Sequence, residues 1–591
     1  MINELIAKAA VSGIVQLYDQ NVDASTIQVQ DTKKEFDGDL TIVVFPLLRI
    51  SKKKPEDTCE DIGQYLVANC EEVIDFNVVK GFLNLTIADQ FWISELANHV
   101  GDKDYGYAKE KSNKTFMVEY SSPNTNKPLH LGHLRNIFLG YSIAEILKAN
   151  GHEVFKTQII NDRGIHICKS MLAWLRFGEG ETPESSGVKG DKLVGKYYVA
   201  FDKEYKKEIA ELVAAGLEEE KAKKIAPIII EAQEMLLKWE AKDPEIYALW
   251  EKMNGWVYSG FDRTYNTMGV DFDELYYESE TYILGKAVVE EGLAEGKYYQ
   301  KDDGSIWVDL SKHKMDDKLL LRADGTSVYM TQDIGTAIER FRKHPTLSGL
   351  IYTVGNEQEH HFKVLFAILE ELGFDWASGC SHLSYGMVEL PSGKMKSREG
   401  TVVDADDLMA DVVEDARVMA NDRGHLEGFS DYQKEELYRT IGLGGLKYYL
   451  LRVDPKKGMM FNPEESIDLN GNTGPFVQYA YARIQSLLNK ADELTGLDTS
   501  LALKPIEKSL IIEILKFSEA IKECENQLSP AVLINYTFNM VKLFNSFYQQ
   551  VAILKEENEA VKNIRLQISD LTATVIFNSM KLIGITVPNK M

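Results

Sequence analysis

The stretch KTFMVEYSSPNTNKPLHLGH, residues 114–133, decides the fold of this chain. It begins with the apolar and aromatic residues that are typical of a buried parallel strand. It breaks at the turn cluster of residues 121–124. A helical pattern with an apolar stripe then runs from Leu134 to about Ala149, and Gly151 ends it. A strand, a turn and a helix N-terminus place backbone N–H groups and a positive dipole end where an anion can bind.

Two histidines, His130 and His133, stand at the start of this helix on either side of Gly132. Imidazoles add directed hydrogen-bond donors without a fixed full charge, which suits a phosphate group. The alternative is a strand-to-helix turn that contains two histidines by chance. Histidine is scarce, with 11 among 591 residues, so we favour the phosphate site.

Composition bounds the class of protein. A chain of 591 residues predicts three or four domains, and 44% hydrophobic with 27% charged residues is typical of a soluble globular protein. No apolar run reaches membrane-spanning length, and the amphipathic start is not a secretory signal. The five scattered cysteines form no C-x-x-C pair, which indicates a reducing cytoplasm and disfavours structural zinc. The net charge of −25 disfavours a general nucleic-acid binder but permits RNA binding through local basic patches.

The first part of the chain, residues 1–110, is expected to be a separate α/β unit. We expect helices at its start and at about 55–70, and strands at 41–45, 73–79 and 81–87. From residue 111 to 403 strands and helices alternate, which predicts a mostly parallel, Rossmann-like sheet. A charged helical insertion, which we interpret as packing only, interrupts it at about 185–260.

The second half of that alternation predicts strands that return to the sheet at 305–310, 319–322 and 349–354. From residue 404 onward the pattern is helical, which we divide into a connector (404–465) and an all-α domain (466–591). The predicted fold class is therefore α/β in the centre, with an α/β domain before it and a helical bundle after it.

Polar residues follow two of the predicted parallel strands. Residues 161–164 come after the strand at 153–160, and residues 355–362 come after the strand at 349–354. Open α/β sheets bind ligands at the carboxyl ends of their strands. A glycine-flanked basic loop at 391–400 also suits the charge of a leaving polyphosphate, although a solvated loop would be the default if it stood alone.

His130–His133, followed by Lys394, Met395, Lys396 and Ser397, resembles the paired motifs of class I aminoacyl-tRNA synthetases. Four further segments resemble arginyl-tRNA synthetases in particular: 118–124, 329–335, 355–361 and 474–484. The resemblance runs along nearly the whole chain and is weakest in the N-terminal unit and the helical insertion.

This resemblance implies a reaction in which arginine and ATP, with Mg²⁺, give arginyl-adenylate and pyrophosphate, after which the arginyl group passes to tRNA(Arg). In-line attack on the α-phosphorus requires mainly positioning and charge stabilisation. The residues implied to contact ATP are His130, Gly132, His133, His361 and Lys394, of which His130, His133 and Lys394 would be catalytic. No metal-ligating residues are implied.

One departure concerns the basic loop, which has Ser397 where the common class I loop has a second lysine. Some family members without that lysine carry one just before the histidine motif, and Lys127 occupies that position. Lys396 is the alternative, and both stay open as catalytic candidates.

The amino-acid pocket must bind a guanidinium, which is planar and always charged and therefore requires carboxylates. The resemblance implies that Glu119 and Asp333 pair with it, that Tyr329 supports the side chain, and that Asn124 and Gln358 complete the pocket. Without the resemblance, Glu119 would be interpreted as a structural ion pair and Asp333 as a helix N-terminal acid.

The resemblance also gives the outer domains a role: the N-terminal unit would contact tRNA, and the C-terminal bundle would bind the anticodon. We expect a cytoplasmic monomer with no membrane association. The rival hypotheses are another class I synthetase, a small nucleotidyltransferase and a catalytically inactive RNA-binding paralogue. Another synthetase is disfavoured by the lack of cysteine-pair zinc sites and by the acidic pocket residues. A small nucleotidyltransferase would not need the long helical region. An inactive paralogue is disfavoured because both histidines and Lys394 are present.

Overall fold

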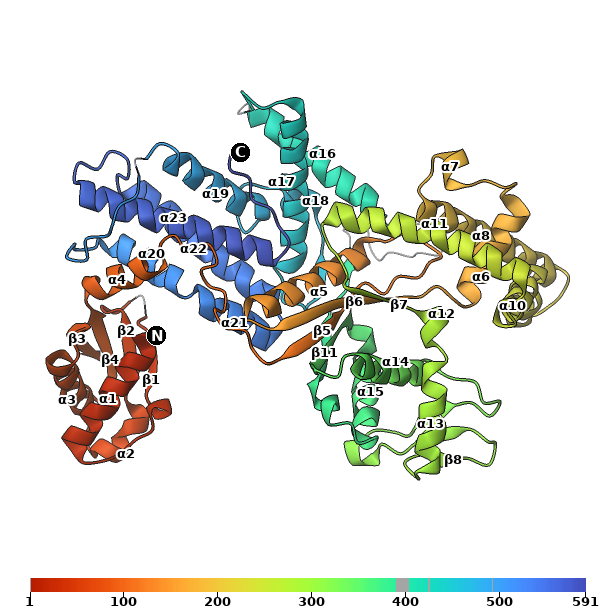
Figure 1. The fold of residues 1–591 in the computed structure, drawn as a ribbon, viewed down its shortest axis with the longest axis horizontal. Coiled ribbons are helices and arrows are strands. Elements are labelled where there is room, and N and C mark those ends of the chain that lie inside the picture. The colour runs from red at the N-terminus through yellow and green to blue at the C-terminus, as the bar shows by residue number, and fades with distance from the viewer. Residues whose placement is uncertain (1, 34, 390–402, 424–425, 492) are drawn as a thin grey trace. The chain divides into compact units, whose positions relative to one another are not determined.

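The computed structural model describes residues 2–33, 35–389, 403–423, 426–491 and 493–591. These residues form two compact units (Figure 1). Unit 1 consists of residues up to 103 with 486–516 and 542–574, and unit 2 consists of 104–485 with 517–541 and 575–591. Among the described residues, no helix is both long and apolar enough to cross a membrane.

Unit 1 contains a four-stranded antiparallel sheet in the order β1-β2-β4-β3, formed by β1 (Gln28–Asp31), β2 (Leu40–Val43), β4 (Phe82–Ile87) and β3 (Val73–Val79). Its helices are α1 (Ile2–Tyr18), α2 (Leu48–Ser51), α3 (Pro55–Asn69) and α4 (Asp89–His99). The predicted strands and the two longer predicted helices are confirmed. Strand β1 was not predicted because its polar, largely exposed residues carry no apolar pattern.

Helix α20 (Pro505–Leu515) also belongs to unit 1, although it lies far along the chain. The Nζ of Lys508 lies 2.8 Å from Asp39 and 3.3 Å from Asp89. Nearby in sequence, Glu507 forms a buried ion pair with Arg565, at 2.6 Å. Segments from both ends of the chain are therefore joined by ion pairs within one unit.

Unit 2 is built on a five-stranded parallel sheet in the order β12-β11-β5-β6-β7. The strands are β5 (Thr115–Glu119), β6 (Glu153–Ile160), β7 (Glu274–Tyr277), β11 (Leu347–Gly355) and β12 (Cys380–Tyr385). Helix α5 (Leu131–Ala149) covers one face, and α14 (Tyr329–Lys343) and α15 (Glu359–Glu371) cover the other (Figure 1). The predicted α/β fold with a parallel sheet is confirmed.

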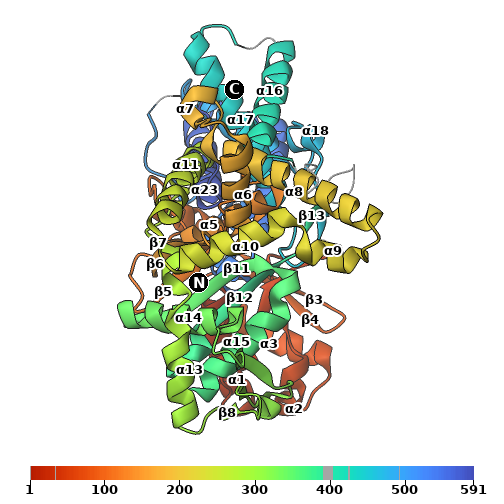
Figure 2. The same ribbon diagram turned by 90° about the vertical axis from the view of Figure 1, so that its right-hand side faces the viewer.

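The helical insertion is also confirmed, and it is longer than predicted. The helices α6 (Ile165–Phe177), α8 (Gly190–Ala214), α10 (Pro227–Glu240) and α11 (Pro244–Met268) pack together (Figure 2), with the shorter α7 (Pro183–Ser186) and α9 (Glu219–Ile225) between them in sequence. Buried residues such as Ile228, Ile229 and Ala232 form its interior.

The prediction that residues 305–310 and 319–322 return to the parallel sheet was wrong. They form β9 (Ile306–Val308) and β10 (Lys318–Leu321) of a separate antiparallel sheet with β8 (Tyr299–Gln300). So short a connection joins antiparallel strands, whereas parallel neighbours need a crossover of about a dozen residues or more. Strand β7 is the one that extends the parallel sheet, and α12 (Glu278–Thr281) and α13 (Leu284–Ala294) follow it.

Beyond residue 403 the described chain is almost entirely helical, as predicted. One short strand, β14 (Met459–Met460), pairs with β13 (Val388–Glu389). The helices are α16 (Ala405–Arg423), α17 (Asp431–Leu451), α18 (Pro463–Ser466), α19 (Gly474–Leu488), α21 (Phe517–Gln527), α22 (Pro530–Gln550) and α23 (Glu559–Leu582).

A buried ion pair joins the central strand to one covering helix. Glu119, the last residue of β5, pairs with Arg340 of α14, whose side chain is completely buried. The Arg340 guanidinium also lies over the ring of Tyr276, 4.6 Å from its centre. Burial by itself would lower the pKa of Arg340, but the Glu119 carboxylate raises it above its ordinary value. The pair therefore fixes α14 against the end of β5.

Glu119→Gln should lower the midpoint of thermal unfolding, because it leaves the Arg340 cation buried without its counter-charge. Breaking a buried pair in this way costs about 3–5 kcal/mol. Scanning calorimetry measures the effect, with Glu339→Gln on the exposed face of the same helix as the control. The double variant Glu119→Gln/Arg340→Met should recover part of the loss; a single variant as stable as the wild type would contradict the assignment.

Candidate active site

The N-terminus of α5 carries the two predicted histidines. His130 is the N-cap residue, and its Nδ1 accepts a hydrogen bond from the Gly132 N–H at 3.2 Å. The Nδ1 of His133 accepts from the His130 N–H at 3.1 Å. Because Nδ1 is the acceptor in both rings, each neutral imidazole carries its proton on Nε2. Each ring can therefore donate an Nε2–H hydrogen bond to a phosphate oxygen.

Both histidines are kept neutral. Burial lowers the pKa of His130 to about 3, and the nearby Lys127 charge adds to this effect. The pKa of His133 is lowered well below its usual value by burial first, and then by His130 and Lys127. Lys127 therefore lies close enough to both rings to affect their charge.

The predicted loop residues Lys394, Lys396 and Ser397 lie outside the described residues. The chain on either side of them is held against the start of α5. Before the gap, the carbonyl of Gly386 accepts a hydrogen bond from the buried Arg135. After it, the carbonyl of Val403 accepts from the Leu131 N–H at 3.3 Å, and the Ala405 N–H donates to the carbonyl of Leu129 at 2.9 Å.

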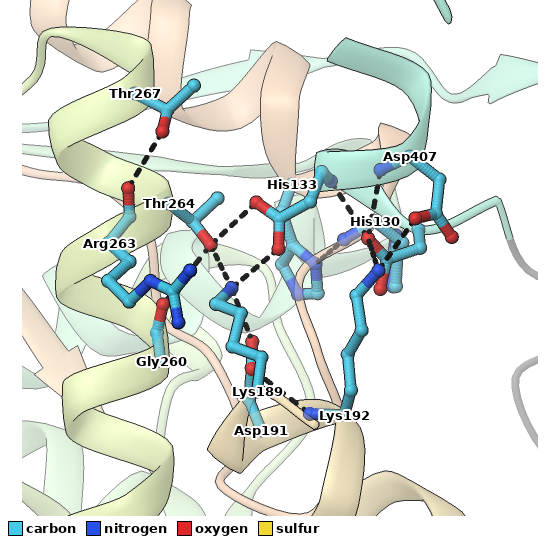
Figure 3. Close-up of polar contacts among 12 residues, drawn as sticks. His130, His133, Lys189, Asp191, Lys192, Gly260, Arg263, Thr264, Thr267 and Asp407 are labelled. Atoms are coloured by element: carbon cyan, nitrogen blue, oxygen red, sulfur yellow. Dashed lines mark hydrogen bonds and ion pairs between the residues drawn. The ribbon is translucent and has the colours of Figure 1, made fainter. Parts of the chain in front are cut away.

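Two lysines of the insertion bind the acidic start of α16, beside the histidines (Figure 3). The Nζ of Lys189 lies 2.6 Å from Asp406. The Nζ of Lys192 lies 3.2 Å from Asp404 and 2.7 Å from Asp407. The insertion therefore helps to hold the segment that follows residues 390–402.

A cavity of about 940 Å³ opens at the carboxyl ends of β5, β6 and β7. Asn124 lines it from the segment after β5, Asn161 and Arg163 from the segment after β6, and Glu278 from α12 after β7. The first turns of α14 close it with three more side chains: Tyr329, Gln332 and Asp333. This is the edge of the sheet at which open α/β folds bind ligands.

Two acids make part of the cavity wall suitable for a cation. Burial raises the pKa of Glu278 to about 7; the Arg163 charge opposes this shift, and the charges of Asp162 and Asp333 add to it. Arg163 pairs with Glu240 at 3.0 Å and lies over the ring of Tyr282, 3.9 Å from its centre. Glu278 and Asp333 are therefore two carboxylates that face one space.

The structure brings together some of the predicted arginine-binding residues and not others. Asn124, Tyr329 and Asp333 line the cavity, and Asp333 accepts a hydrogen bond from the predicted ATP-binding residue His361 at 2.6 Å. Glu119 and Gln358 are not among the described residues that line the cavity. Glu119 binds Arg340 instead, and Gln358 is exposed in the turn before α15.

Glu278 was not predicted from the sequence. It follows β7, a four-residue strand that carries too short a pattern to stand out after a long helical insertion. The signal that could have identified it is the pair Tyr276-Tyr277, with high β propensity, directly before an acid. Among the described residues, no cluster of three or more histidine, cysteine or acidic side chains is arranged to bind a metal ion.

The fold and these motifs define a catalytic domain of the class I aminoacyl-tRNA synthetases. The family model described as "tRNA synthetases class I (R), catalytic domain" matches residues 95–462. A second model, described as "DALR anticodon binding domain", matches residues 477–591.

The chain belongs to the arginyl-tRNA synthetase family. It is 56% identical to the arginine–tRNA ligase of Flavobacterium psychrophilum and 54% identical to that of Bacteroides thetaiotaomicron, in each case over 100% of both chains. Its fold is similar to that of the Thermus thermophilus arginyl-tRNA synthetase, with a TM-score of 0.78, 23% identity and 100% of both chains covered. The Plasmodium falciparum enzyme gives a TM-score of 0.76 at 18% identity, covering 100% of this chain and 99% of that one.

Lys127→Ala should raise the pKa of both His130 and His133, because it removes a cation that lowers them. NMR titration of the labelled histidines measures the shift. Lys207→Ala, at an exposed ion pair on α8, is the control and should leave both values unchanged. Identical titrations in the wild type and the Lys127 variant would place that lysine away from the rings.

Proposed function

We propose that the chain attaches L-arginine to tRNA(Arg) in an ATP-dependent reaction with an arginyl-adenylate intermediate. The observation that carries the proposal is the cavity at the strand ends, with Glu278 and Asp333 facing it. Two carboxylates suit a guanidinium, which presents several N–H donors in a fixed plane.

In the first step, a carboxylate oxygen of arginine attacks the α-phosphorus of ATP, and the bond from that phosphorus to the bridging oxygen breaks to release pyrophosphate. Mg²⁺ accompanies the ATP. His130 and His133 donate Nε2–H bonds to phosphate oxygens at the positive end of α5. Lys394, with Lys127 or Lys396, neutralises the charge that moves to the leaving group.

In the second step, a hydroxyl of the 3′-terminal ribose of tRNA attacks the arginyl carbonyl carbon, and the bond to the phosphate oxygen breaks to release AMP. Residues 1–110 contact the tRNA and residues 466–591 bind its anticodon, with residues 404–465 as the connector between catalytic and anticodon-binding domains. We place the protein in the cytoplasm as a monomer. Its five cysteines carry no disulfide, which fits a reducing compartment.

Within the site, Asp333 and Glu278 bind the guanidinium, Tyr329 lies along the side chain, and Asn124 binds the α-amino or carboxylate end. Glu119 acts through Arg340, because their ion pair places α14 and therefore Asp333. ATP lies against His130, Gly132, His133 and His361.

The direct test is ATP–pyrophosphate exchange. Exchange should occur with arginine when tRNA(Arg) and Mg²⁺ are present, and it should not occur with lysine, glutamate or glutamine. The control is the same reaction without amino acid. No exchange with arginine under these conditions would refute the proposal.

The KM for arginine should depend on pH near 7. Glu278 must be ionised to bind the cationic substrate, and its pKa is raised to about 7, so the KM should rise as the pH falls below that value. One proton permits up to about a tenfold rise per pH unit. Exchange kinetics at pH 6, 7 and 8 measure it.

Two variants make this test specific. Glu278→Gln should raise the KM for arginine by about a hundredfold and abolish its pH dependence in this range, since the loss of one partner of a buried charge pair costs roughly 2–5 kcal/mol. Glu280→Gln, an exposed acid of the same helix, should behave as the wild type. A KM for arginine that is constant from pH 6 to 8 in the wild type would show that Glu278 does not bind the substrate.

A further inference from the structure

Asp162 lies behind the wall of the arginine cavity. It follows β6, and its neighbours Asn161 and Arg163 both line the cavity. Asp162 itself is only 1% exposed. A carboxylate buried to this degree needs hydrogen bonds or a counter-charge, so its contacts show what it does.

The Asp162 carboxylate accepts two hydrogen bonds from Ser279. Its Oδ1 accepts a hydrogen bond from the Ser279 N–H at 2.8 Å, and its Oδ2 accepts from the Ser279 hydroxyl at 2.7 Å. Oδ2 also accepts from the Tyr258 hydroxyl of α11 at 3.0 Å. Burial raises the pKa of Asp162, and the hydrogen bonds from Ser279 and Tyr258 oppose that shift.

The backbone of Asp162 adds two more contacts with the insertion. Its carbonyl accepts hydrogen bonds from the Trp250 indole N–H at 2.6 Å and from the Asn254 amide at 3.4 Å. The end of β6, helix α11 and helix α12 therefore meet at this single residue.

Ser279 directly follows Glu278, the acid that faces the cavity. Both belong to α12, which has only four residues and so has few backbone hydrogen bonds of its own. The two hydrogen bonds that Ser279 donates to Asp162 therefore help to fix Glu278, together with the pairing of Tyr277 to β6.

The charge of Asp162 also acts on the cavity. It is one of the acids that affect the ionisation of Glu278, together with Asp333, while Arg163 opposes them. The other charged or titratable residues among the described lining of the cavity are His166, Glu240, Lys286 and Arg322. A buried acid behind the wall makes the site more favourable for a cation without touching it.

We propose that Asp162 is a positioning residue for the arginine site: it holds Glu278 in place through Ser279 and adds a negative charge behind the pocket that favours a cationic side chain. This inference rests on the proposed function. Asp162 contacts the substrate in neither step, so its effect should be confined to arginine.

The test is Asp162→Asn, which removes the charge but keeps an acceptor for the Ser279 N–H. The KM for arginine should rise by about tenfold, equivalent to about one pKa unit of lost interaction, while the KM for ATP stays unchanged. The pH midpoint of the arginine KM should move to lower pH, because a charge that raises the pKa of Glu278 has been removed. Asp243→Asn, the same change at the N-cap of α11, is the matched control and should leave all three values unchanged.

Ser279→Ala separates position from charge and covers the case in which Asp162→Asn does not fold. It keeps the Asp162 charge but loses one hydrogen bond, so the KM for arginine should rise while the pH midpoint stays. The inference would be overturned if the KM for arginine were unchanged in both variants. It would also be overturned if the KM values for arginine and ATP rose equally while the pH midpoint of the arginine KM stayed the same. Absence of arginine-dependent exchange in the wild type would instead refute the proposed function itself.

Discussion

The ion pair between Glu119 and Arg340 is the constraint on which the site depends. It lies where the central strand ends and joins that strand to α14 with no exposure of the arginine. Because Asn124 follows the strand and Asp333 stands in the first turns of α14, the geometry of this pair sets the distance between two walls of the cavity. A residue at the strand end therefore affects the shape of the cavity from outside it.

Helix α5 organises the other half of the site in a similar way. Its first turn carries His130, and its buried Arg135 binds backbone carbonyls of Gly386 and Lys457. The chain after residue 402 forms backbone hydrogen bonds with the same turn. The described residues on both sides of 390–402 are thus fixed relative to the histidines.

The two halves of the site carry different ionisable groups. At α5, burial and a neighbouring lysine keep the imidazoles neutral, so they act as hydrogen-bond donors beside a positive helix end. At the ends of β6 and β7, Glu278 faces the cavity with the buried Asp162 behind it, and burial raises the pKa of both carboxyl groups.

The sequence by itself determined the strand, turn and helix of residues 114–149, the parallel sheet and the insertion, because these depend on local periodicity. It also gave the candidates Asn124, Tyr329, Asp333 and His130, because they belong to motifs whose residues are close in sequence. Only the tertiary structure decided that β9 and β10 form a separate sheet, that Glu119 binds Arg340, and that Glu278 faces Asp333 with Asp162 behind it. The charged residues of the last two findings come from segments about 50 to more than 200 positions apart. Their charges acquire a role only when burial brings them together in a medium of low dielectric constant, which local sequence patterns do not encode.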